Sequence, residues 1–122
     1  MGTADKLVQV IEAKTANHTI VKEDFGKLFT NRGATGAVTF TLPAVVPGFK
    51  SCYVEFYTLE AQDVTIAGTA GELVTFNDAA ANSVAFSTAG DEIGNYAKAI
   101  CDGTSWLIIL GIEGAVVATV AT

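Results

Sequence analysis

Hydrophobic and polar residues alternate with a period of two along most of the chain. In "VTFTL" (38–42), Val38, Phe40 and Leu42 lie on one side of an extended chain and two threonines lie on the other. Strands with one buried face have this pattern, and Thr, Val, Phe and Tyr favour strands. The expected strands are residues 7–13, 18–22, 27–31, 37–43, 52–59, 63–68, 72–76, 83–88, 96–103, 106–112 and 115–120.

Turn signals separate these segments, and no segment has helical periodicity with start and stop signals. In "NRGATG" (31–36), Asn31, Gly33 and Gly36 are expected to supply the tolerance for positive φ that a tight reversal needs, and Pro43 ends the strand that follows. The stretch "NDAAANS" (77–83) is expected to be a loop.

The pattern therefore predicts one all-β domain over residues 1–122. We expect a β-sandwich, a jelly-roll-like fold or a small barrel of short antiparallel strands. Residues 1–6 are expected to form an N-terminal arm, mobile or ordered by a partner, and residues 114–122 are expected to form a final strand.

The composition is unusually apolar. Half of the 122 residues are hydrophobic and only 16% are charged, whereas about a quarter of the residues of a typical soluble domain are charged. The longest apolar stretch, 106–121, is interrupted by Gly111, Glu113 and Gly114, so no transmembrane helix is expected, and no signal-peptide pattern follows Met1. The apolar excess instead favours burial against other protein subunits.

Charge and cysteine usage narrow the possible partners. The net charge is −6, and the seven Lys and Arg residues are scattered, so nucleic acid is not an expected partner. Cys52 and Cys101 lie in apolar runs and are predicted to be buried free thiols.

No segment carries a recognisable catalytic or metal-binding motif. The glycine-rich residues 33–40 lack the lysine and the helix of a phosphate-binding loop. His18, the single histidine, is expected to face solvent at the start of a strand, which leaves both cysteines without a base. The acidic pairs 23–24 and 91–92 lack calcium-loop spacing and are expected to be solvated loop charges.

Two carbohydrate-directed hypotheses remain. Glu55 and Asp63 could face each other as a glycosidase pair, although nothing in the sequence marks them. Trp106 is expected to anchor the core, and the other candidates for a sugar-binding surface are Tyr53, Tyr57 and Tyr96. No catalytic residue, cofactor or metal is predicted.

Three segments together resemble a family of small β-rich structural modules of tailed-bacteriophage virions. They are "DFGKLFTNRGATGAVTFTLP" (24–43), "AQDVTIAG" (61–68) and "AICDGTSWLII" (99–109). The family is found as head decoration (cement) proteins and within tail fibres and spikes. The resemblance extends from about Ile20 to Ile109.

This resemblance implies a non-enzymatic virion protein. The favoured expectation is a capsid decoration protein, synthesised in the host cytoplasm, that oligomerises as a homotrimer and docks on the major capsid protein of the outer shell. Because the chain is a single module, decoration is favoured over a fibre. The alternatives are a tail-fibre or spike module that attaches to the host surface, and a carbohydrate-binding module.

The predicted subunit or capsid contacts lie near the two ends of the chain and at one loop tip. The alternative is that the residues near the two ends lie in the core of the domain and that the loop arginine is solvated. The residues are Leu7, Val8, Val10, Arg32, Val116, Val117 and Val120.

Overall fold

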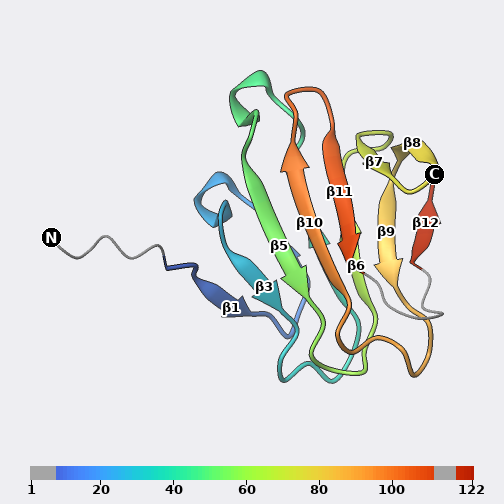
Figure 1. Cartoon of the computed structure of the whole chain (residues 1–122). Helices are drawn as coiled ribbons and strands as arrows, with labels where there is room; N and C mark the ends of the chain where they lie inside the picture. The colour runs from blue at the N-terminus through green and yellow to red at the C-terminus, as the bar shows by residue number, and fades with distance from the viewer. Residues whose placement is uncertain (1–7, 112–117) are drawn as a thin grey trace, which may run out of the picture.

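The computed structural model describes residues 8–111 and 118–122 and contains two β-sheets packed face to face (Figure 1). This confirms the predicted all-β class. Two short 3₁₀ turns, η1 (Lys22–Asp24) and η2 (Pro47–Phe49), interrupt the strands. The seven-stranded sheet has the order β1 (Ile11–Ala13), β3 (Leu28–Thr30), β5 (Tyr53–Tyr57), β10 (Tyr96–Cys101), β11 (Trp106–Gly111), β7 (Leu73–Thr75) and β8 (Asp78–Ala81). The five-stranded sheet has the order β12 (Thr119–Ala121), β9 (Ser83–Phe86), β6 (Val64–Ala67), β4 (Val38–Thr41) and β2 (His18–Thr19).

The first six strands alternate between the two sheets, and this makes their neighbours parallel. A chain that crosses to the opposite sheet after each strand returns in its original direction, so the intervening strand serves as the crossover that parallel pairing requires. The parallel pairs are β1–β3, β3–β5, β2–β4, β4–β6 and β7–β11. The expectation of antiparallel strands throughout is therefore wrong, because a period of two shows which side of a strand is buried but not its direction.

The second half of the chain is mostly antiparallel and closes one side of the sandwich. β10 lies between β5 and β11, and β9 lies between β6 and β12. Beside β8, the Asn82 N–H donates to the Ala121 carbonyl at 2.6 Å, and the Thr122 hydroxyl donates to Asp78 at 2.5 Å. On the opposite side, no backbone hydrogen bond joins β1 to β2 within the described chain.

The core forms where the sequence pattern predicts it. Val38, Phe40 and Leu42 are buried, and the Phe40 ring lies 5.0 Å from the Phe56 ring. Trp106 is fully buried, and its indole N–H donates to the Pro43 carbonyl at 2.9 Å, which confirms it as a core anchor. Full burial of one large apolar side chain in this core contributes about 1.5–3 kcal/mol to the free energy of unfolding.

The loop after β3 depends on a buried amide. The Asn31 side-chain oxygen accepts the backbone N–H groups of Leu59 (2.7 Å) and Glu60 (3.0 Å), and Asn31 is fully buried. Of the three positions expected to supply positive φ, only Gly33 does so, with φ of 85°. For Asn31 and Gly36 the expectation is wrong, because Asn31 acts through its side chain and not through its backbone conformation.

Residues 77–83, expected to be a loop, contain β8. This strand pairs with β7 through a hairpin in which Asn77 adopts φ of 59°. Asparagine tolerates this conformation in tight hairpin turns. The turn signal was therefore correct, but it marks a hairpin and not a long loop.

The two cysteines are free and lie opposite each other at the start of β5 and the end of β10. The Cys101 N–H donates to the Cys52 carbonyl at 2.9 Å. Cys101 is buried, as predicted, whereas Cys52 is only half-buried.

We predict that Asn31→Ala lowers the free energy of unfolding by about 3 kcal/mol, because two buried N–H groups lose their acceptor. Urea denaturation measures this change. Gln62→Ala is the control, since Gln62 is only partly buried and is expected to change stability by less than about 0.5 kcal/mol. Equal effects for the two variants would contradict the role assigned to Asn31.

Candidate functional site

The candidate functional site is the outer face of the seven-stranded sheet, meaning the side that points away from the core. No described segment crosses in front of β5, β10 and β11 (Figure 1). Most of its side chains are apolar or aromatic, and Ile109 and Tyr57 are among the exposed large hydrophobic residues of the molecule. By strand alternation the outer-face residues include Ile11, Leu28, Tyr53, Glu55, Tyr57, Tyr96, Lys98, Ile100, Leu107 and Ile109.

Glu55 lies at the centre of this face. It accepts hydrogen bonds from the Tyr96 hydroxyl and from the Gln9 amide, the latter at 2.5 Å. Burial raises the pKa of Glu55, but these bonds and the charge of Lys98 lower it, and the net pKa lies below its ordinary value. Burial and the bond to Glu55 raise the pKa of Tyr96, so the pair stays a carboxylate and a neutral phenol at neutral pH. Through Gln9, Glu55 also ties the segment before β1 to β5.

Lys98 makes the other polar contact of the outer face. Its ammonium group lies 4.6 Å from the centre of the Tyr53 ring. Lys98 is also directly opposite Glu55 in the β5–β10 register. The two charges of the outer face are thus balanced, and the surrounding surface is apolar.

Two hollows lie where the outer face approaches β1. The first, of about 490 Å³, is lined by residues that include Val8, Val10 and Glu23. The second, of about 540 Å³, is lined by Ile11, Leu28 and Leu59 among others, with Arg32 at its edge. Arg32 forms no ion pair with any described residue.

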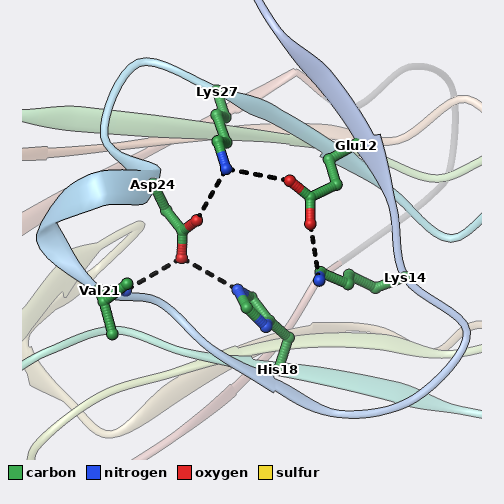
Figure 2. Close-up of polar contacts among 6 residues, drawn as sticks. All are labelled: Glu12, Lys14, His18, Val21, Asp24 and Lys27. Atoms are coloured by element: carbon green, nitrogen blue, oxygen red, sulfur yellow. Dashed lines mark hydrogen bonds and ion pairs between the residues drawn. The ribbon is translucent and has the colours of Figure 1, made fainter.

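A cluster of charged groups fills the open side of the sandwich between β1 and β2; we call it the end cluster (Figure 2). Glu12 lies in β1 and Lys14 directly follows it, His18 comes from β2, and Asp24 and Lys27 come from η1 and the turn after it. The Lys27 ammonium donates to Glu12 at 3.0 Å and to Asp24 at 3.1 Å, and Lys14 lies 2.6 Å from Glu12. The cluster therefore links the first strands of both sheets.

Asp24 is the buried member of the end cluster. Its carboxylate accepts the Val21 N–H at 3.1 Å and the His18 Nε2–H at 3.0 Å, in addition to Lys27. Burial raises the pKa of Asp24, but these three hydrogen bonds lower it, and the net pKa lies below its ordinary value. The ionised form of Asp24 is therefore the one that the fold stabilises.

Three expectations about the solvent exposure of ionisable side chains are wrong. Asp24 and Glu92 were expected to be solvated, yet both are buried, and Glu92 accepts the Gly90 N–H at 3.0 Å. His18 does start a strand, but it is half-buried, with its ring 5.2 Å from the Phe29 ring. His18 has a ring partner from a distant segment, which the sequence does not show to be adjacent, whereas Glu92 is bonded within its own turn.

The structure does not assemble the catalytic arrangements considered from the sequence. Glu55 lies on the outer face of one sheet, whereas Asp63 directly precedes β6 in the other sheet. No serine or cysteine of the described chain is hydrogen-bonded to His18. Within residues 8–111 and 118–122, no group of three His, Cys, Asp or Glu residues could hold a metal ion.

The predicted contact residues fall in different environments. Val8, Val10 and Arg32 are exposed and line the two hollows. Val120 of β12 is half-buried against the core. The remaining three lie outside the described residues: Leu7, Val116 and Val117.

The outer face was missed as a unit by sequence reasoning. Alternation within residues 52–59 separates Tyr53, Glu55 and Tyr57 from the core. Tyr53, Tyr57 and Tyr96 are also candidates for a sugar-binding surface on the sequence alone. Nothing in the sequence shows that β10 lies beside β5, which is what brings Lys98 and Tyr96 to Glu55.

Comparison with known proteins does not extend these findings. No protein-family model and no curated protein matches the chain. Among the described residues, no helix is long and apolar enough to cross a membrane.

We predict that Asp24 makes stability depend on pH. The pKa of Asp24 is lowered in the folded state, so its carboxylate contributes fully to stability above the pKa of the unfolded chain, about 4. This stabilisation is lost as the pH falls through the pKa of the folded state. At pH 7, Asp24→Asn should lower the free energy of unfolding by about 1.5–3 kcal/mol. Urea titrations at decreasing pH should show the difference in unfolding free energy between wild type and Asp24→Asn becoming smaller.

The control for this experiment is Asp91→Asn, which removes an exposed carboxylate. Its pH dependence should follow the wild type. A gap between wild type and Asp24→Asn that stays constant from neutral to strongly acidic pH would contradict the assignment.

Proposed function

We propose that this chain is a non-enzymatic structural protein of a tailed-bacteriophage virion, and specifically a capsid decoration protein that oligomerises and docks on the outer shell. The resemblance of residues 24–43, 61–68 and 99–109 to phage modules supports this function. The proposed partners are further copies of the chain, with a trimer as the form the resemblance implies, and the major capsid protein.

The observation that carries the proposal is the uncovered, mostly apolar outer face. Exposed apolar surface of this kind marks sites of protein contact. The face consists mainly of aromatic and aliphatic side chains, and its charges, Glu55 and Lys98, balance each other. The cores of protein interfaces have this composition, with few charged and many aromatic residues. A protein that binds only the assembled shell stabilises that shell by mass action.

Placement on the tail, in a fibre or spike that attaches to the host surface, is the alternative within the same class. The outer face would serve either assembly. Immunogold labelling of virions separates them, because label confined to the tail excludes decoration of the head.

Carbohydrate binding is a second candidate, favoured by the arrangement of the tyrosines. Tyr57 and Tyr96 are direct partners in the β5–β10 register, and Tyr53 lies on the same face. Aromatic rings on one face can stack against a sugar. Binding on a glycan array that is lost in Tyr57→Ala would favour this function over decoration.

We predict that the protein raises the melting temperature of undecorated capsids. At a concentration 100 times the dissociation constant, binding stabilises each site by about 2.7 kcal/mol. Ile109→Asp, which places a carboxylate opposite Lys98 on the outer face, should weaken binding at least about tenfold. The contact loses the isoleucine side chain, whose burial contributes about 1.5–3 kcal/mol, and tenfold corresponds to about 1.4 kcal/mol. Differential scanning calorimetry and co-sedimentation measure the two effects.

Thr69→Asp adds the same charge at an exposed position outside the strands and should bind like the wild type. Unchanged melting of capsids at saturating protein would contradict the proposed function. Equal binding by Ile109→Asp and Thr69→Asp would show that the outer face is not the docking surface.

A further inference from the structure

Within residues 8–111 and 118–122, part of the β1 backbone has no hydrogen-bond partner. The Leu28 N–H donates to the Val10 carbonyl and the Lys14 N–H donates to the Thr30 carbonyl, both at 2.9 Å. Because backbone groups alternate sides along a strand, the N–H and C=O groups of Ile11 and Ala13 point away from β3. They are available to pair with another strand.

The other edges of the two sheets differ from this one. β8 and β12 are joined to each other by the Asn82–Ala121 and Thr122–Asp78 bonds. β2 contains only two residues. Among the described edge strands, β1 alone combines open backbone groups with large exposed hydrophobic residues in and just before the strand: Val8 is 77% exposed, Val10 55% and Ile11 66%. An edge of this kind is a template for strand pairing.

β1 is also held firmly in place. Lys27 connects Glu12 to the buried Asp24 (Figure 2), and Gln9 bonds to Glu55 of β5. The edge is therefore ordered before any partner arrives, which reduces the entropy lost on association.

The charges of β1 identify a second copy of the chain as the partner. Glu12 and Lys14 lie on the same side of the strand and form an ion pair at 2.6 Å. In an antiparallel pair centred on Ala13, Glu12 of each copy lies directly opposite Lys14 of the other, and opposite charges in this position stabilise pairing. On the other side of the strand, Ile11 and Ala13 carry no charge.

We propose that two copies associate through antiparallel pairing of their β1 strands, with a two-fold axis at Ala13, so that the seven-stranded sheet continues from one copy into the other. The two outer faces then lie on one side of a shared sheet and form one larger apolar surface. This pairing rests on the proposed function, which requires copies of the chain to associate, and it identifies the β1 edge as the surface through which they do so. It predicts a pair, or an assembly of pairs, in place of the trimer that the resemblance implies.

Native mass spectrometry and amide hydrogen exchange test this pairing. The mass should double from 12.6 kDa as the concentration rises towards millimolar. Over the same range, exchange of the Ile11 and Ala13 amides should slow at least about tenfold as the paired fraction grows. The Glu12 amide, which faces β3, should be protected throughout.

Two variants isolate the strand contact. Ala13→Pro removes an outward N–H that the fold does not use, and it should raise the dissociation constant at least about tenfold while the monomer melts near the wild-type temperature. Lys14→Glu should also raise the dissociation constant by placing like charges opposite each other, and because it removes the ion pair with Glu12 it should lower the melting temperature of the monomer as well. Lys50→Glu is the matched control, since Lys50 is exposed and lies outside β1, and its dissociation constant should stay unchanged.

A chain that stays monomeric at all concentrations would overturn the inference, and so would an oligomer in which Ile11 and Ala13 exchange as fast as in dilute solution. Neither result bears on capsid binding, which is measured separately with undecorated capsids. Conversely, a β1-paired dimer that binds no capsid would support the pairing and contradict the proposed function.

Discussion

The carboxylate of Asp24 is the contact on which the open side of the sandwich depends. On the other side, a backbone hydrogen bond from Asn82 to Ala121 and a side-chain bond from Thr122 to Asp78 connect β8 and β12. β1 and β2 have only three and two residues and share no backbone hydrogen bond in the described chain. Asp24 accepts hydrogen bonds from Val21, His18 and Lys27, and Lys27 reaches Glu12. Side chains thus provide the connection between sheets that the backbone lacks, and buried charged groups stabilise only when they are fully paired in this way.

The need for such a cluster follows from the path of the chain. Alternation between the sheets over the first six strands produces parallel neighbours and leaves β1 and β2 at one end, each with a single strand partner among the described strands. The same path directs the phenylalanines of β3, β4 and β5 into the core, where Phe29, Phe40 and Phe56 pack together. No part of the described chain forms a second layer over the opposite side of the seven-stranded sheet, so its tyrosines and aliphatic residues remain available for contacts.

The sequence was informative where one residue's neighbours along the chain determine its environment. Alternation placed Val38, Phe40 and Leu42 in the core and Tyr53 and Tyr57 outside it. It did not show strand direction, because parallel and antiparallel strands share the same period. It also could not show that Asn31 caps residues 59 and 60, that Asp24 is buried, or that Cys52 lies opposite Cys101, since each depends on contacts between distant segments. For the candidate site, the sequence supplied the tyrosines but not the register that joins them to Glu55 and Lys98.

The central claim is that the uncovered face of the seven-stranded sheet is an assembly surface on a phage shell. Cryo-electron microscopy of capsids incubated with the purified protein tests this claim most directly. We expect ordered density on the outer surface of the shell, with the residues around Glu55, Lys98 and Ile109 buried in protein contacts. Bare shells, or bound protein whose seven-stranded sheet faces solvent, would contradict it.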